Sequence, residues 1–232
     1  MAGLFVTFEG TEGSGKSTQI RLLAERLSEM GRVVLTLREP GGTPVGEEIR
    51  HTLKHSEANG AMFPETELFL INASRAQLVR EVIRPALCAG KIVLCDRFFD
   101  STIAYQVFGR CLDSTQVQRI IDVAVGDTIP HLTLLLRVPL EISEQRRAIR
   151  STEAGRDRFE AEGREFFRRV EHGYDAIASN TDTRVRTIDA TRSIEQVHQE
   201  VWRWVEALLC VPPTQGERAW KTIGEYRTEG PG

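Results

Sequence analysis

The sequence predicts an α/β fold, in which a five-stranded parallel sheet has helices on both faces and a short arginine-rich lid follows the fourth strand. Short apolar runs alternate with longer amphipathic runs along the 232 residues, which implies parallel strands joined by right-handed crossovers. The apolar runs lack strict polar–apolar alternation, as expected for strands buried on both faces. A glycine-rich run starting at Gly10 follows the first strand candidate. We expect ligands at the carboxyl ends of these strands.

Each strand candidate is a short run rich in Leu or β-branched residues. In chain order, these runs are residues 4–9, 33–38, 92–96, 132–138 and 184–188. The helix candidates fill the gaps, with apolar residues at helical spacing. They are residues 16–30, 45–55, 65–89, 114–125, 140–151, 163–179 and 193–209. The last helix begins with a capping box at 193–196. Trp202 and Trp204 flank its apolar stripe, which indicates packing in the core or at an interface.

The run from Gly10 to Ser17 has the form G-x-x-x-x-G-K-S of a phosphate-binding P-loop, so the predicted fold is of the P-loop NTPase type. Its glycines let backbone N–H groups point at phosphate oxygens, and the next helix adds its N-terminus. Lys16 is expected to reach the β- and γ-phosphates of ATP, and Ser17 to ligate Mg²⁺. The alternative is a glycine-rich turn with an incidental lysine, which leaves the flanking strand and helix unexplained. The ATP-binding candidates are Gly10, Thr11, Glu12, Gly13, Ser14, Gly15, Lys16, Ser17 and Thr18.

Two further strand candidates end in polar residues. Arg38 ends the second and precedes a Pro-Gly-Gly turn, where it could hold an anion, although a routine turn explains the pattern equally well. The third ends in Asp96, which fits the carboxylate that holds Mg²⁺ in P-loop sites. Arg97 beside it could clamp a phosphoryl group. A structural ion pair between Asp96 and a helix residue is the alternative.

Arginines gather between residues 146 and 169, interleaved with Asp and Glu. A solvated helix face is the usual explanation of such a run. Phosphoryl transfer, however, spreads negative charge over the moving group, and an arginine on a closing segment stabilises that charge. We therefore expect a lid at about 146–163, in which one or two arginines act chemically and the others are solvated or paired.

Composition excludes several classes of function. The net charge of −3 gives no reason to expect nucleic-acid binding or attraction to an anionic membrane. Four scattered cysteines are expected to be free buried thiols in a reducing cytoplasm rather than a metal or redox site. His51 and His55, one helical turn apart, are expected to be solvated. No run resembles a signal peptide or is long enough to span a bilayer.

Together these features resemble the thymidylate kinase family, whose members phosphorylate dTMP to dTDP with ATP. The resemblance covers about residues 4–209 and rests on several motifs in the family's order. They are F-E-G-T-E-G-S-G-K-S at 8–17, R-E-P-G-G-T at 38–43, S-R-A-Q at 74–77, D-R-F at 96–98, S-T-I-A-Y-Q at 101–106, D-R-F-E at 157–160 and T-I-D-A at 187–190. The resemblance implies a P-loop nucleotide kinase domain over 1–210. Residues 211–232 are polar and end in Gly-Pro-Gly, and we expect them to form an appended tail. The resemblance also implies ATP, dTMP and Mg²⁺ as ligands, and a homodimer formed through the helix at 65–89.

On the phosphate side, the resemblance implies that Glu12 lies near the 3′-hydroxyl of the acceptor and its phosphate or the metal. Arg97 would grip the acceptor phosphate, and Arg38 would help to align it. The P-loop carries no arginine between its glycines, which in this family goes with a catalytic arginine from the lid. The lid candidates are Arg150 and Arg156 for phosphate contact and Arg158 for holding the lid together.

On the base side, Arg75 matches the arginine that hydrogen-bonds the thymine edge, and Thr102 would face N3 of the base. Tyr105 would crowd the 2′ position and favour deoxyribose. Ser101 and Gln106 would line the same pocket.

One position departs from the family pattern. Four residues before the thymine-binding arginine the family usually has a stacking Phe, and here Ile71 stands there. Because base–aromatic stacking stabilises binding by about 1–3 kcal/mol, we expect weaker dTMP binding, or compensation by Phe98 or Phe99. Two other functions stay open: a kinase for UMP or CMP, and an ATP-binding module without transferase activity.

Overall fold

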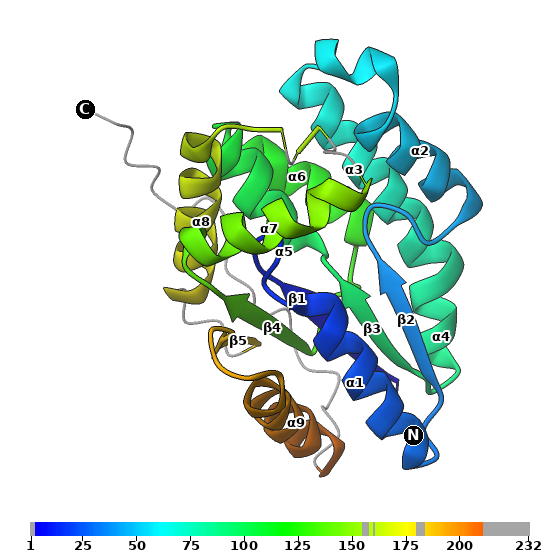
Figure 1. The fold of residues 1–232 in the computed structure, drawn as a ribbon. Helices are drawn as coiled ribbons and strands as arrows, with labels where there is room; N and C mark the ends of the chain where they lie inside the picture. Colours follow the sequence, from blue (N-terminus) through cyan, green and yellow to red (C-terminus); the bar gives the residue numbers. More distant parts are fainter. Residues whose placement is uncertain (1–2, 155–157, 160, 180–183, 211–232) are drawn as a thin grey trace.

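Five parallel strands form one sheet in the computed structural model (Figure 1), which describes residues 3–154, 158–159, 161–179 and 184–210. The strand order is β2-β3-β1-β4-β5. The strands are β1 (Leu4–Glu9), β2 (Val34–Arg38), β3 (Ile92–Asp96), β4 (Leu132–Arg137) and β5 (Val185–Asp189). The predicted α/β fold is confirmed, and every strand end lies within one residue of its predicted position.

Helices occupy all the predicted intervals. They are α1 (Lys16–Glu29), α2 (Pro44–Lys54), α3 (Pro64–Leu78), α4 (Arg84–Cys88), α5 (Phe99–Thr102), α6 (Ser114–Val125), α7 (Leu140–Ala154), α8 (Arg164–Ser179) and α9 (Ile194–Cys210), with a 3₁₀ turn, η1, at Glu57–Ala61. The long predicted helix at 65–89 contains a π-helical turn, η2 (Val79–Ile83), between α3 and α4. Pro85 follows this turn, and it lacks the N–H that a continuous α-helix would use there.

The helical stretch at 99–109 was not predicted. α5 runs directly into the π-helical segment η3 (Ile103–Gly109), and every residue from 99 to 109 is buried. A helix buried on all sides has no polar face, so its sequence lacks the periodicity by which amphipathic helices are recognised.

Each face of the sheet packs against its own helices (Figure 1). Val6 and Phe8 of β1 join the apolar cluster formed with α1 and α9, whereas Phe5 joins the cluster formed with α3, α6, α8 and η3. This alternation places neighbouring side chains of one strand in opposite layers. The predicted burial on both faces is confirmed for β1, β3 and β4, whereas the edge strands β2 and β5 are only partly buried.

Helix α8 approaches η3 closely at Gly173. A Cβ atom on Gly173 would lie 2.9 Å from the Cα of Ala104 and 2.9 Å from a ring carbon of Phe108. Any larger residue would push the two elements apart. The spacing between α8 and η3 is therefore set by a glycine.

Helix α9 begins with the predicted capping box. The backbone N–H of Gln196 donates to the Ser193 hydroxyl at 3.3 Å, and the backbone N–H of Ser193 donates to the Gln196 side chain at 3.2 Å. Trp202 is buried, and the guanidinium of Arg26 on α1 lies 3.7 Å from the centre of its ring. Trp202 thus packs α9 onto α1, as predicted for a core residue.

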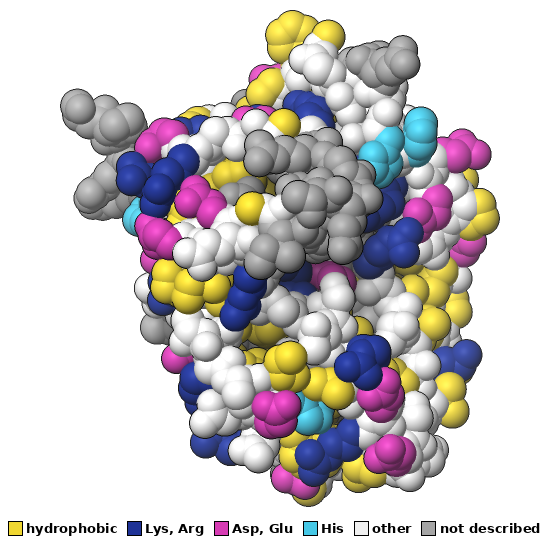
Figure 2. Space-filling view, viewed as in Figure 1, with side chains coloured by type: hydrophobic (Ala, Val, Ile, Leu, Met, Phe, Trp, Pro, Cys, Tyr) yellow, Lys and Arg dark blue, Asp and Glu magenta, His cyan; other side chains and the backbone are white. Residues whose placement is uncertain are grey.

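The surface carries mixed charge. Lys and Arg side chains are interspersed with Asp and Glu over the face shown in Figure 2. All four cysteines are free, but only Cys95 is buried. The expectation of burial was wrong for the other three, which lie at helix ends or in a loop: Cys88, Cys111 and Cys210. Within the described ranges, no helix is long and apolar enough to cross a membrane.

Candidate active site

The glycine-rich run forms the turn between β1 and α1, as predicted. Gly10 has a φ of +133°, and a Cβ atom there would lie 2.3 Å from the carbonyl oxygen of Leu136. Only glycine fits this conformation and this space. Gly15 caps α1, so the N–H groups of the first turn of that helix face the carboxyl end of the sheet.

Lys16 lies folded over this loop. Its Nζ donates to the carbonyl oxygens of Thr11 at 2.9 Å and Gly10 at 3.1 Å. Burial lowers the pKa of Lys16, and the nearby guanidinium of Arg97 lowers it further. A buried ammonium group beside a ring of N–H donors makes this loop attractive to an anion.

Ser17 and Asp96 meet across the carboxyl end of the sheet. The Ser17 hydroxyl donates to Oδ2 of Asp96 at 3.0 Å. The two residues are distant in sequence, but β1 and β3 pair in parallel with Phe8 opposite Asp96. The two metal-ligand candidates are therefore adjacent, and both offer oxygen atoms, the ligands that Mg²⁺ prefers.

Arg97 has a φ of +72°, which is rare for a residue other than glycine. Its Nη1 donates to Ser101 at 3.1 Å and to the Tyr174 hydroxyl at 3.0 Å, and its Nη2 donates to the Tyr105 hydroxyl at 3.2 Å. Its Nη2 also lies 3.7 Å from a carboxylate oxygen of Glu12. Three hydroxyls and a carboxylate thus fix the direction of this guanidinium.

Glu9 accepts hydrogen bonds from two of the hydroxyl groups that hold Arg97, those of Ser101 and Tyr174. The sequence patterns did not identify this residue. One oxygen of Glu9 accepts the backbone N–H of Phe98 at 2.7 Å, and the other accepts the hydroxyls of Ser101 at 2.6 Å and Tyr174 at 3.0 Å. Burial, together with the neighbouring charge of Asp100, raises the pKa of Glu9 to about 7. The feature of the sequence that could have indicated Glu9 is its position as an acidic residue at the end of a buried strand.

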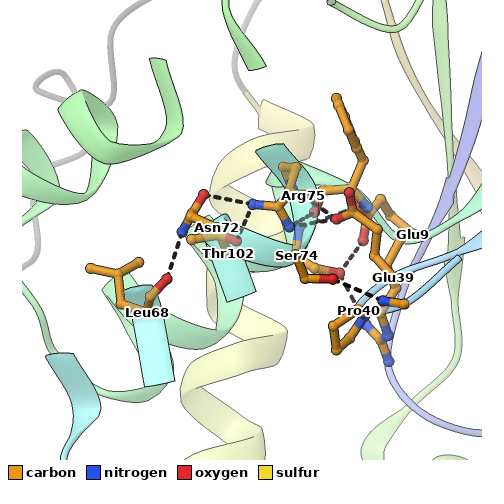
Figure 3. Close-up of polar contacts among 12 residues, drawn as sticks. Glu9, Glu39, Pro40, Leu68, Asn72, Ser74, Arg75 and Thr102 are labelled. Atoms are coloured by element: carbon orange, nitrogen blue, oxygen red, sulfur yellow. Dashed lines mark hydrogen bonds and ion pairs between the residues drawn. The ribbon is translucent and has the colours of Figure 1, made fainter. Parts of the chain in front are cut away.

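Arg75 is the centre of a buried polar network (Figure 3). Its Nε donates to Glu39 at 2.7 Å, its Nη1 donates to Asn72 at 3.0 Å and Thr102 at 2.8 Å, and its Nη2 donates to the carbonyl of Phe98 at 3.1 Å. A second contact from Nη2 to Glu39 measures 2.7 Å. All three nitrogen atoms of the Arg75 guanidinium therefore have protein acceptors. Burial raises the pKa of Glu39, while Arg75 opposes that rise.

Two cavities adjoin at the carboxyl end of the sheet. The larger has a volume of about 460 Å³ and lies along the P-loop, and the smaller has about 70 Å³ and lies between α3 and η3. Glu12 and Arg97 line both of them. The larger is lined by most of the P-loop candidates, namely Glu12, Gly13, Ser14, Gly15, Lys16, Ser17 and Thr18. Gly10 and Thr11 do not line it.

The smaller cavity gathers nearly all the predicted acceptor residues. They are Glu12, Ile71, Arg75, Arg97, Ser101, Thr102, Tyr105 and Gln106. Arg38 lines the larger cavity instead, where it pairs with Glu47 at 2.9 Å. The structure thus brings together residues from four separate motifs around one cavity.

Phe98 or Phe99 was expected to compensate for the missing stacking Phe at position 71, and this expectation is wrong. Phe98 and Phe99 are fully buried in the core and do not line the smaller cavity. Phe159 and Phe167 line it instead. Their sequence positions gave no signal, because one lies in a charged run and the other on the apolar face of α8.

The arginines of the expected lid lie in different environments. Arg146 lines the larger cavity and donates to the carbonyl of Gly13 at 3.0 Å, a contact that the sequence did not indicate. Arg158 pairs with Glu67 of α3. Arg156 and the side chain of Arg150 lie outside the described residues, as does the 211–232 tail.

Comparisons with known proteins show which family this chain resembles. A family model described as thymidylate kinase matches residues 8–201. The thymidylate kinase of Kosmotoga olearia is 45% identical over 208 residues, which cover 90% of this chain and 97% of that protein. That of Thermomicrobium roseum is 48% identical over 205 residues, with 88% and 95% covered. The crystal structure of thymidylate kinase from Ehrlichia chaffeensis aligns with a TM-score of 0.71 at 35% identity, over 89% of this chain and 99% of that one.

Replacing the buried carboxyl group of Glu9 is expected to change how the free energy of unfolding depends on pH. Because the pKa of Glu9 is about 7 when folded and 4.5 ordinarily, its contribution is fully present below pH 4.5 and is lost as the pH rises through 7. The stability of the wild type relative to Glu9→Gln should therefore fall by at most about 3 kcal/mol between pH 4.5 and 8. Urea unfolding at both pH values measures this, with exposed Glu25→Gln as control. A difference that is independent of pH would contradict it.

Proposed function

The chain belongs to the thymidylate kinase family, and we propose that its two adjoining cavities hold the two substrates of that reaction. The enzyme transfers the γ-phosphoryl group of ATP to dTMP, which gives dTDP. We assign ATP to the larger cavity and dTMP to the smaller. The observation that carries this assignment is the junction, where Glu12 and Arg97 line both cavities. Two phosphate groups entering from the two sides would meet there end to end.

On the donor side, the P-loop N–H groups and Lys16 neutralise the β- and γ-phosphates of ATP. The adjacent hydroxyl of Ser17 and carboxylate of Asp96 fit a magnesium ion by their chemistry. When bound, Mg²⁺ supplies positive charge that stabilises the developing charge on the phosphates.

On the acceptor side, Arg97 grips the phosphate of dTMP, with Arg38 aligning the phosphate from the larger cavity. The hydroxyl cage around Arg97 orients its guanidinium before substrate arrives, which lowers the entropic cost of alignment. Because the acceptor is already an anion, the reaction requires no strong general base, and positioning with charge neutralisation supplies most of the rate. We assign stabilisation of the transferring group to the lid residues Arg150 and Arg156.

The base and sugar are held by α3 and η3. We assign the thymine edge to Arg75 and Thr102, which both line the smaller cavity and are joined by a hydrogen bond of 2.8 Å from Nη1 of Arg75. Tyr105, whose ring lies 5.0 Å from the guanidinium of Arg97, crowds the 2′ position and favours deoxyribose. Ser101 and Gln106 complete the pocket wall.

A coupled assay with a panel of nucleoside monophosphates tests this function. We expect kcat/KM for dTMP to exceed that for UMP or CMP by at least about tenfold, and ADP formation to require the acceptor. Lys16→Ala should abolish transfer and leave the unfolding midpoint nearly unchanged, while Arg21→Ala on the exposed face of α1 should keep full activity. A preference for UMP or CMP would favour the alternative kinase, and acceptor-independent binding without transfer would favour a non-catalytic module.

Substituting the stacking position is expected to improve acceptor binding. Ile71 lines the smaller cavity, and Ile71→Phe would add a ring that can stack on thymine. We expect KM for dTMP to fall severalfold, since a base–aromatic contact stabilises by about 1–3 kcal/mol. Ile71→Leu, which keeps the volume without the ring, should give no such gain. An unchanged or raised KM in Ile71→Phe would defeat this expectation.

We also propose that the chain forms a homodimer through α3 and α6. These helices pack side by side, and each exposes a large apolar side chain: Phe69 is 59% exposed and Val123 is 75% exposed. A second copy of the chain would cover this face. Light scattering should give twice the monomer mass for the wild type and the monomer mass for Phe69→Asp combined with Val123→Asp. A monomeric wild type would contradict the proposal.

A further inference from the structure

Glu67, a buried carboxylate that is not among the proposed catalytic groups, binds the lid at Arg158. Glu67 of α3 is fully buried. Its Oε1 accepts from Gln106 at 2.9 Å and from Nε of Arg110 at 3.1 Å. Its Oε2 accepts from Nη2 of Arg110 at 2.9 Å and from Nη1 of Arg158. One carboxylate therefore joins the acceptor pocket, through Gln106, to the lid, through Arg158.

Charge explains why Arg158 stays at this position. Two largely covered guanidinium groups, each 12% exposed, share Glu67, and Arg110 also pairs with Glu162 at 2.5 Å. The two cations and two carboxylates balance, so removing Arg158 from the group would leave part of a buried negative charge uncompensated. Arg158 also donates to the carbonyl of Met62 at 3.2 Å. The chain at Arg158 is thus held from two sides.

The next residue, Phe159, lines the smaller cavity together with Ile71 and Tyr105. Its ring centre lies 6.4 Å from that of Tyr105, with the two rings nearly perpendicular at 80°. Where α3 offers the aliphatic Ile71, the lid offers an aromatic ring. Fixing Arg158 on Glu67 fixes this ring beside the cavity.

We infer that Phe159 contacts the bound thymine as an aromatic wall of the acceptor cavity, and that Glu67, acting through Arg158, is the positioning group for this wall. The inference rests on the proposed function, with dTMP in the smaller cavity. It assigns part of the affinity for dTMP to Phe159 and leaves phosphoryl transfer to other residues.

Steady-state kinetics on the full chain, with dTMP varied at saturating ATP and Mg²⁺, test the inference. Phe159→Ala should raise KM for dTMP about tenfold, with kcat within about twofold and KM for ATP unchanged. Phe159→Tyr should restore the wild-type KM. Arg158→Ala should also raise KM for dTMP, and the double variant should be no worse than Phe159→Ala, because both changes remove one contact. Arg164→Ala, which loses exposed ion pairs with Glu141 and Glu144, is the matched control.

Three results would overturn the inference in a chain that phosphorylates dTMP. They are an unchanged KM for dTMP in Phe159→Ala, additive losses in the double variant, and a fall in kcat without a change in KM for Arg158→Ala. Equilibrium dialysis with dTMP and unfolding midpoints extend the comparison to any inactive variant, since a folded Phe159→Ala that binds dTMP as tightly as the wild type also overturns it. A wild type without activity on dTMP would refute the proposed function itself.

Discussion

The parallel pairing of β1 with β3 is the constraint on which the site depends. Because Phe8 lies opposite Asp96, the two strands end at the same level, and the residues that follow them diverge around one space. The P-loop leaves from β1, and Arg97 leaves from β3 in a left-handed backbone conformation. A shift of the register by one residue would turn Asp96 away from Ser17 and break both sides of the site at once.

A buried ion pair makes one wall of this space rigid. Arg75 is 1% exposed and its partner Glu39 3%, and both residues line the smaller cavity. Removing one partner of such a pair leaves an uncompensated buried charge, which costs about 3–5 kcal/mol. The side chains around the smaller cavity are therefore held by electrostatics as well as by packing, and they present fixed donors and acceptors.

The sequence predicted the sheet, the helices with a polar face and the residues of three motifs, because each leaves a local pattern. Glycine spacing marked the P-loop, and apolar runs ending in polar residues marked Arg38 and Asp96. Glu9, Glu39, Glu67 and Tyr174 could not be identified in this way, because their roles arise from contacts between distant segments. The stretch at 99–109 was missed for a related reason: burial on every side removes the periodicity that marks a helix.

The close approach at Gly173 has a consequence for altering this protein. Gly173 of α8 lies directly against the Cα of Ala104 and the ring of Phe108 in η3, so the two elements cannot move closer, and any side chain at this position would push them apart. Adapting the protein to bulkier or slimmer nucleotide analogues must therefore proceed by trimming or enlarging side chains on a frame of constant width. Directed evolution toward unnatural nucleotides should accumulate changes along Ser101–Gln106 and leave the glycine in place.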